Sequence, residues 1–463
     1  MKYVSTRGQS PELDFEGVLR AGLARDGGLY VPANWPELSV DEISDLAGRP
    51  YVDIARKVMW PFIGDTIARP DFDRIVETAY AGFNHSAIAP LVQMDHRHWL
   101  LELFHGPTLA FKDFAMQVLA GLMDHVLERR QEKITIVGAT SGDTGSAAIE
   151  AFRGKSSVEV FILFPDGRVS DVQRRQMTAV ADENIHTIAL DGTFDDCQAI
   201  VKGLFNDLSF RDRVHLAGVN SINWARIMAQ IVYYFSSAVA LGAPYRQVQF
   251  CVPTGNFGDI FAGYVAKKMG LGISNLIIAT NINDILVRTL NTGDHSPSKV
   301  VPTESPSMDI QVSSNFERLL FENCGRDAGR ICHLMEQLAK EGSYHLSENE
   351  RVPLLAEFEA VSVNQEQMFE TIKSSFAASR YMADPHTAVG LAAAYRSDRE
   401  NRDPVITLAT AHPAKFPDTL VRALGQEPQL PERLAAQRNL EERFTRLPGE
   451  IDAVKAFIES RGD

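Results

Sequence analysis

Lys112 lies in an apolar stretch of the sequence, which is an unusual surrounding for a lysine. Residues 101–116 read LELFHGPTLAFKDFAM, so Phe111 and Phe114 flank the lysine and Asp113 is its neighbouring charge. Burial lowers the pKa of a lysine, and a partly neutral lysine forms Schiff bases with carbonyl compounds. The alternative is a lysine at the start of an amphipathic helix, with its stem on the core and its ammonium group in water. The other motifs must decide between the two.

Two glycine-rich segments each follow an apolar run and precede a helical pattern. They are residues 137–148 (VGATSGDTGSAA) and 251–264 (CVPTGNFGDIFAGY). Backbone N–H groups at the start of a helix favour an anion, and the second segment is compact enough for a single phosphate ester. Neither has the spacing of a dinucleotide-binding G-x-G-x-x-G motif or of a P-loop. The alternative for each is an ordinary capped turn between a strand and a helix.

Two further segments carry groups that suit a small ligand. Residues 407–417 (TLATAHPAKFP) include Thr410, whose hydroxyl could bond a ring nitrogen, whereas His412 and Lys415 are typical of a solvated loop. Residues 219–227 (VNSINWARI) include Arg226, whose planar guanidinium suits a carboxylate or phosphate; an asparagine-rich helix cap is the alternative. An apolar lysine, a phosphate cradle, a hydroxyl for a ring nitrogen and anion-binding groups together indicate pyridoxal phosphate and an anionic amino acid.

The composition excludes several classes of protein. The chain has 463 residues and is 45% hydrophobic and 23% charged, as globular proteins are. Its net charge of −14 argues against a nucleic-acid-binding face. The four cysteines form no C-x-x-C pair, which indicates a reduced compartment and no zinc ribbon. No apolar stretch is long enough to cross a bilayer, so we expect a cytoplasmic protein without a metal.

The order of apolar and helical patterns predicts an α/β fold. The predicted strands are Ile134–Val137, Val158–Phe164, His186–Leu190, Gln247–Val252, Leu276–Ala279 and Val405–Ala409. Alternation of such strands with helices is typical of open, mostly parallel sheets, which bind ligands at the carboxyl ends of their strands. We predict a mainly helical N-terminal unit (1–97), two α/β regions (98–240 and 241–430) and a C-terminal helical tail (431–463). A helical insertion is expected at about 285–380.

Eight ordered motifs resemble a known family from nearly one end of the chain to the other. They are residues 5–8 (STRG), 23–32 (LARDGGLYVP), 105–113 (HGPTLAFKD), 139–146 (ATSGDTGS), 220–226 (NSINWAR), 253–259 (PTGNFGD), 305–310 (SPSMDI) and 410–416 (TAHPAKF). Together they resemble the threonine synthases, in the long class of bacteria and fungi. That family belongs to the fold-type II (tryptophan-synthase-like) pyridoxal-phosphate enzymes.

The resemblance implies a role for each matching residue. Lys112 would be the catalytic residue and would form the Schiff base with the cofactor. The other residues that would hold the cofactor are Gly255, Asn256, Phe257, Gly258, Asp259, Thr410 and Asp143. Thr410 would meet the pyridine nitrogen, and Asp143 takes the position where many relatives have an asparagine beside the 3-hydroxyl group. The candidates for the substrate's carboxylate and phosphate are Thr140, Ser141, Asn220, Asn223 and Arg226.

The implied reaction converts O-phospho-L-homoserine and water to L-threonine and phosphate, with Lys112 as general base at Cα and then at Cβ. A phospholyase or dehydratase that releases a 2-oxo acid would use the same residues. A catalytically idle binding protein on this fold is a second alternative, and a nucleotide-binding protein is a third. Relatives in this fold type are monomers or homodimers.

Overall fold

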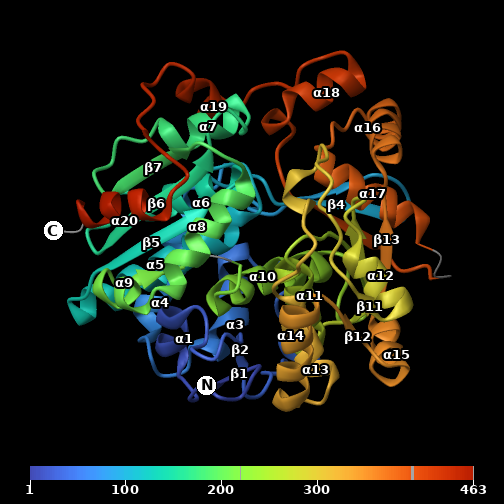
Figure 1. The fold of residues 1–463 in the computed structure, drawn as a ribbon. Helices are drawn as coiled ribbons and strands as arrows, with labels where there is room; N and C mark the ends of the chain where they lie inside the picture. Colours follow the sequence, from blue (N-terminus) through green and yellow to red (C-terminus); the bar gives the residue numbers. More distant parts are fainter. Residues whose placement is uncertain (219–220, 398–400, 462–463) are drawn as a thin grey trace.

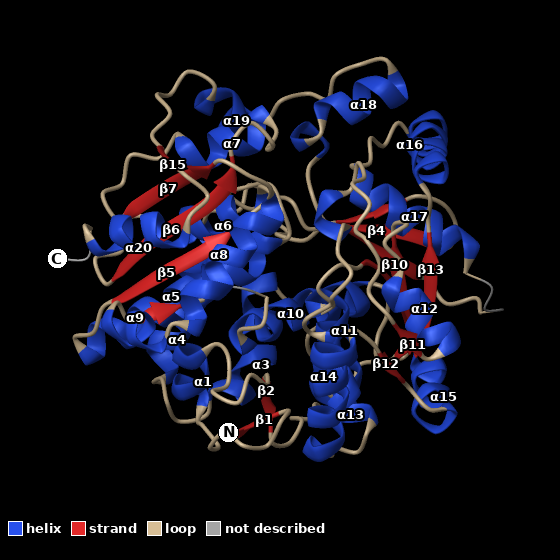
Figure 2. Cartoon of the chain, in the orientation of Figure 1, coloured by secondary structure: helices blue, strands red, loops and turns tan. Residues whose placement is uncertain are grey.

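Two open sheets form the framework of the chain, and a long buried helix lies between them (Figure 1). The computed structural model describes residues 1–218, 221–397 and 401–461. The five-stranded sheet is parallel throughout, in the order β15-β7-β6-β5-β8. The six-stranded sheet has the order β13-β10-β9-β14-β4-β3, and only the edge strand β3 is antiparallel to its neighbour. Helices cover both sheets, as Figure 2 shows, which confirms the predicted α/β class.

All six predicted strands are present. In the five-stranded sheet the strands are β5 (Ile134–Ala139), β6 (Val158–Pro165), β7 (Ile185–Leu190), β8 (Leu216–Ala217) and β15 (Thr445–Leu447). In the six-stranded sheet they are β3 (Leu91–Gln93), β4 (His98–Glu102), β9 (Val248–Pro253), β10 (Ile273–Thr280), β13 (Phe358–Ser362) and β14 (Val405–Ala409). Two small antiparallel pairs join β1 (Tyr3–Ser5) to β2 (Tyr30–Pro32) and β11 (Asp294–His295) to β12 (Tyr344–His345). The central strands are almost entirely buried, as parallel strands covered on both faces must be.

The helices fall into groups along the chain. The N-terminal ones are α1 (Phe15–Ala21), α2 (Val40–Ser44), α3 (Tyr51–Ile63) and α4 (Arg69–Ala81). Those from the first α/β region are α5 (Lys112–Arg130), α6 (Asp143–Phe152), α7 (Asp171–Thr178), α8 (Phe194–Asn206), α9 (Leu208–Arg213) and α10 (Trp224–Ala240). The second region contains α11 (Gly258–Lys268), α12 (Ile285–Thr292), η1 (Pro306–Met308), α13 (Phe316–Asn323), α14 (Ala328–Glu341), α15 (Glu348–Glu357), α16 (Gln365–Ser379), α17 (Pro385–Arg396), η2 (Pro413–Lys415) and α18 (Pro417–Leu424). The tail adds α19 (Glu432–Gln437) and α20 (Ile451–Glu459).

Helix α10 connects the N-terminal unit to both α/β regions. It packs against α3, α5 and α11, and nearly all of its residues are buried. A helix that is apolar on every side must be enclosed by other elements, and the sequence WARIMAQIVYYFSSAVA meets that condition. At its start, Trp224 contacts the rings of Tyr3, Trp35 and Phe62. The two sheets are therefore joined through one continuous core.

The division of the chain differs from the predicted one at several strands. Strand β4, which we assigned to the first region, lies between β14 and β3 in the six-stranded sheet. The tail, expected to be helical, also adds β15 to the edge of the five-stranded sheet. The helical insertion contains β13, an edge strand paired with β10. The pairings of β4 with β14, of β15 with β7 and of β13 with β10 join segments far apart in the sequence, so local apolar patterns do not determine these partners.

No helix in the described part of the chain has both the length and the apolar character needed to span a membrane.

The turn before α5 depends on a close approach that only glycine permits. A Cβ atom added to Gly106 would lie 2.5 Å from Cβ of Asp113, and Asp113 is fully buried. We expect Gly106→Ala to lower the free energy of unfolding by about 1–3 kcal/mol, because overpacking must displace Asp113. Gly82→Ala, whose nearest neighbour is Pro107 Cγ at 3.7 Å, is the control. Denaturant titration measures both, and equal stabilities would contradict this packing.

Candidate active site

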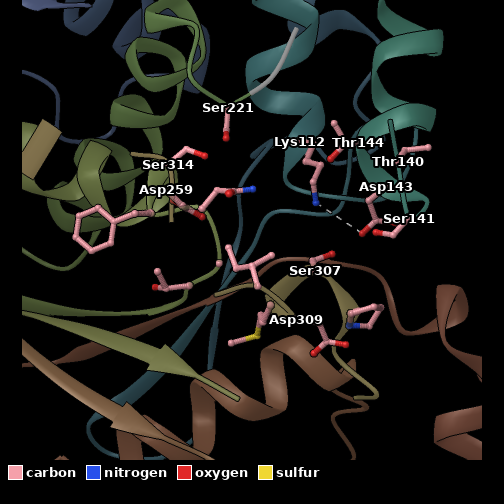
Figure 3. A pocket seen from close by; sticks show the side chains of 18 of the residues that line it. Lys112, Thr140, Ser141, Asp143, Thr144, Ser221, Asp259, Ser307, Asp309 and Ser314 are labelled. Atoms are coloured by element: carbon pink, nitrogen blue, oxygen red, sulfur yellow. Dashed lines mark ion pairs between the residues drawn. The ribbon is translucent and has the colours of Figure 1, made fainter. Parts of the chain in front are cut away.

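A cavity of about 510 Å³ opens between the two sheets. The turns that follow three parallel strands contribute to its wall: residues 140–144 after β5, residues 254–259 after β9, and Thr410 after β14. Parallel strands bring their carboxyl ends to one edge of a sheet, so the turns after β9 and β14 meet at one edge of the six-stranded sheet, and the turn after β5 lies at the corresponding edge of the five-stranded sheet, across the cavity. Figure 3 shows Lys112, Thr140, Ser141, Asp143 and Thr144 on one side and Asp259 and Ser314 opposite them.

Lys112 is the first residue of α5 and points into the cavity (Figure 3). Only 9% of it is exposed, and its Nζ lies 4.6 Å from the centre of the Phe111 ring. Burial lowers the pKa of Lys112 to about 8, and the positive charges of Arg226 and Lys415 act in the same direction, while Asp143 opposes them. Lys112 is therefore an amine that can be neutral near physiological pH.

Asp143 begins α6 and forms an ion pair with Lys112. One carboxylate oxygen, Oδ1, lies 2.8 Å from Nζ of Lys415 and accepts a hydrogen bond of 2.8 Å from Nε2 of Gln173. The other, Oδ2, lies 3.9 Å from Nζ of Lys112 (dashed line in Figure 3). Burial raises the pKa of Asp143, but the two lysines and the hydrogen bonds from Lys415 and Gln173 outweigh it and hold the pKa below its ordinary range.

Lys415 is the important residue that the sequence analysis missed. It was expected in a solvated loop, but none of its surface is exposed. Its Nζ donates to the carbonyl oxygen of Thr108 at 2.9 Å, in addition to its ion pair with Asp143. The expectation failed because burial of this loop is decided by contacts with residues some 300 positions away. A sequence signal that could have identified Lys415 was the motif TAHPAKF, which contains this lysine and is one of the motifs of the family resemblance.

The loop between β9 and α11 presents backbone N–H groups. Ser313 Oγ donates to the Gly255 carbonyl at 2.7 Å, and the backbone and side-chain nitrogens of Asn315 donate to the Asn256 carbonyl at 3.1 and 3.0 Å. In a trans peptide the next N–H points the opposite way, so those of Asn256 and Phe257 point away from these donors. They have no acceptor among the described residues.

Gly255 is required by the packing of that loop. A Cβ atom there would lie 2.5 Å from the carbonyl oxygen of Ser307. Gly258 opens α11, which has no side-chain cap. The loop thus combines unpaired N–H groups with a helix N-terminus, the arrangement that binds a phosphate.

Asp259 also lines the cavity, but its carboxylate interacts with other side chains. The hydroxyl of Tyr233 donates to Oδ1, and that of Tyr234 does so at 3.1 Å. Burial raises the pKa of Asp259 to about 6, although both tyrosine hydrogen bonds and Lys112 lower it. An acidic side chain would repel a phosphate, so a contribution to phosphate binding must come from the backbone of Asp259 at the start of α11.

The predicted substrate-binding residues have different positions. Ser141 and Arg226 line the cavity, and burial lowers the pKa of Arg226 to about 10. Thr140 also lines it, but its hydroxyl accepts hydrogen bonds from the N–H groups of Gly142 and Gly145, both at 2.9 Å. Asn220 lies outside the described residues.

Asn223 requires a correction. Its side-chain oxygen caps α10 by accepting from the Ala225 N–H at 3.1 Å, and its Nδ2 donates to the Leu19 carbonyl at 2.9 Å. Both polar groups of this buried side chain are engaged in structure, and Asn223 does not line the cavity. Asn223 is therefore a helix cap, which was the alternative interpretation of the asparagine-rich segment 219–227.

His386 belongs to the wall of the cavity and was not predicted. Its Nε2 accepts a hydrogen bond of 3.2 Å from the Ser307 N–H, and its Nδ1 lies 3.0 Å from the Asp384 carboxylate. Both side chains of this pair are buried. The pair holds η1, the segment whose Ser307 carbonyl lies closest to Gly255, so it supports the loop between β9 and α11.

Three family models cover most of the chain. Residues 2–80 match "Threonine synthase N terminus", residues 87–357 match "Pyridoxal-phosphate dependent enzyme" and residues 387–458 match "Threonine synthase, C-terminal". The threonine synthase of Pseudomonas aeruginosa is 52% identical, over 100% of this chain and 99% of its own. The chain belongs to the threonine synthases, within the pyridoxal-phosphate dependent enzymes.

Solved structures agree with this assignment. A PLP-bound threonine synthase from Brucella melitensis is similar at a TM-score of 0.97 and 54% identity, over 100% of this chain and 99% of its own. The yeast threonine synthase is similar at a TM-score of 0.94 and 41% identity, over 99% and 98% of the two chains. The fold-type II class predicted from the sequence is confirmed.

The environment of Lys112 predicts an unusual pH dependence of its chemical reactivity. In the cofactor-free chain, acetylation of Lys112 by acetic anhydride should have an inflection near pH 8, where the amine becomes neutral. At pH 7 the neutral fraction would be roughly 300-fold larger than for a lysine of pKa 10.5. Peptide mass spectrometry measures the modification, with exposed Lys340 as the internal reference. An inflection near pH 10.5 would contradict the described burial.

Proposed function

We propose that this chain converts O-phospho-L-homoserine and water to L-threonine and phosphate, with pyridoxal phosphate as cofactor. The observation that carries the proposal is Lys112, a buried lysine with a lowered pKa that shares its cavity with an uncapped glycine loop. Membership of the threonine synthases supports the choice of substrate. We retain the predictions of a cytoplasmic location and of a monomer or homodimer as part of the proposal.

The described residues fit pyridoxal phosphate. Lys112 Nζ is the amine that would bond to the cofactor's aldehyde, and the N–H groups of Asn256 and Phe257 would receive its phosphate. The backbone at Gly255 leaves no space for a side chain there. Thr410, which lines the cavity, would meet the ring nitrogen with a neutral hydroxyl. When bound, the cofactor supplies a conjugated ring that stabilises negative charge at the substrate's carbon atoms.

Lys112 is the group that would move protons on the substrate. A neutral amine can accept a proton from Cα and then one from Cβ, and loss of the Cβ proton lets phosphate leave Cγ. A proton then returns to Cγ, water adds its OH at Cβ, and a proton returns to Cα to complete threonine. Its lowered pKa matches this task, because a general base works best when its pKa lies near the operating pH. The Nζ of Lys112 lies 3.9 Å from Asp143 Oδ2, beyond hydrogen-bond distance, so no hydrogen bond to Asp143 holds the amine.

The cavity also suits an anionic substrate. Arg226 is a buried cation on its wall, and Ser141 and Thr144 add hydroxyl donors beside the start of α6. A guanidinium binds a carboxylate or phosphate through two parallel hydrogen bonds. We therefore assign the substrate's carboxylate and phosphate to these groups, in place of the side chain of Asn223.

The reaction is tested by measuring threonine and phosphate from O-phospho-L-homoserine. The wild-type chain should release both in equal amounts. Lys112→Ala should lower the rate by about 100-fold or more, because it removes the general base. Lys340→Ala, at an exposed lysine, should retain full activity. Phosphate with 2-oxobutanoate instead of threonine would keep the cofactor assignment and make the chain a phospholyase.

The glycine loop can be tested through cofactor affinity. In Gly255→Ala the added Cβ must push against the Ser307 carbonyl, which displaces the N–H groups that would hold the phosphate. We expect the affinity for pyridoxal phosphate to fall by about tenfold or more, the usual cost of losing a hydrogen bond to a charged group. Gly272→Ala, with 3.7 Å of space to Gln247, is the control. Absorbance titration measures both, and equal affinities would locate the phosphate elsewhere.

A further inference from the structure

Lys415 lies directly behind the wall of the cavity. It is fully buried in η2, after β14, but it does not line the cavity, whereas its ion-pair partner Asp143 does. It therefore reaches a bound ligand only through Asp143. The two residues come from different α/β regions, so their ion pair crosses the junction of the two regions beneath the site.

The carboxylate of Asp143 is shared unequally between two lysines. Nζ of Lys415 is 2.8 Å from Oδ1, but Nζ of Lys112 is 3.9 Å from Oδ2. Gln173 donates to the same Oδ1 at 2.8 Å, so two donors fix one oxygen and orient the other towards Lys112. The closer ion pair of Asp143 is with the lysine that takes no part in the proposed chemistry.

A second set of hydrogen bonds holds Lys415 in place. Its Nζ donates to the Thr108 carbonyl at 2.9 Å, and Gln176 donates to the same carbonyl at 3.0 Å. The N–H and hydroxyl of Thr108 bond the carboxylate of Asp113, the residue after Lys112, at 2.8 and 2.7 Å. Lys415 is therefore attached to the same turn that begins the helix of Lys112.

From this geometry we infer that Lys415 is a positioning residue that holds the Asp143 carboxylate. Lys112 then does not form a close ion pair with Asp143 and can release its proton. A buried carboxylate with one lysine as neighbour would pair with it closely, and the lysine would keep its proton. The second cation competes for the same anion and prevents this. The inference rests on the proposed function, in which Lys112 must act as a neutral amine.

The direction of the effect follows from the charges that face Lys112. These are the anions Asp143, Asp113 and Asp259 and the cations Arg226 and Lys415. Removing Lys415 takes away one cation and frees Asp143 to approach Lys112. Both changes favour the protonated form of Lys112. Removing the charge of Asp143 favours the neutral form.

The test follows how fast the near-visible absorption band appears when pyridoxal phosphate is added to the cofactor-free full chain, as a function of pH. Loading requires neutral Lys112, so the wild-type rate should rise through about pH 8. In Lys415→Met the midpoint should move up by one pH unit or more, with loading at pH 7 slower by about tenfold. Lys415→Arg retains the charge and should keep the wild-type midpoint. Asp143→Asn should move the midpoint down.

A positioning role predicts opposite shifts of the midpoint in Lys415→Met and Asp143→Asn. A merely structural role would lower the extent of loading in both variants without moving either midpoint. Circular dichroism identifies the variants that fold. If Lys415→Met does not fold, Lys415→Gln, which keeps a donor without the charge, should show the same upward shift. An unchanged midpoint in a folded Met or Gln variant would overturn the inference. A wild-type chain that gains no absorption band would instead overturn the proposed function.

Discussion

The structure depends on one lysine that is buried in the protein core and can lose its charge there. Lys112 is buried among apolar groups, and its pKa is lowered to about 8 chiefly by that burial. An isolated buried charge is costly, and charged groups in protein interiors are paired or hydrogen-bonded. Here the balance is set by a cluster in which Asp143 carries the negative charge and Lys415 holds it in place. Burial lowers the pKa of Lys112, Asp143 raises it, and Lys415 acts in the same direction as burial.

The fold brings this cluster together from distant parts of the chain. The turns after β5, β9 and β14 contribute Asp143, the glycine loop and Lys415, and each turn is fixed by its position at the carboxyl end of a parallel strand. The core around α10 then holds the two sheets so that these ends face one another across the cavity. The glycine loop supplies N–H groups and Lys112 supplies the amine, so the site joins an anion-binding element to a nucleophile.

The sequence was sufficient for the elements whose identity is local. Long apolar runs such as Val158–Phe164 predicted the buried strands, and Lys112 between two phenylalanines indicated a buried amine. Pairings between distant segments were not predictable: β4 and β15 are short, and nothing local selects their partners. The same limit applies to Lys415, because a lysine in a polar loop becomes buried only through Asp143 and Thr108. The prediction for Asn223 failed for a different reason, since an asparagine side chain can serve equally well as a group that binds a ligand or as a helix cap.

The central claim is that Lys112, and not the neighbouring Lys415, bonds to the cofactor. Borohydride reduction of the chain loaded with pyridoxal phosphate makes that bond permanent, and peptide mass spectrometry then identifies the modified lysine. The account predicts the pyridoxyl group on the peptide that contains Lys112, with Lys415 unmodified. Modification of Lys415, or of surface lysines alone, would contradict it.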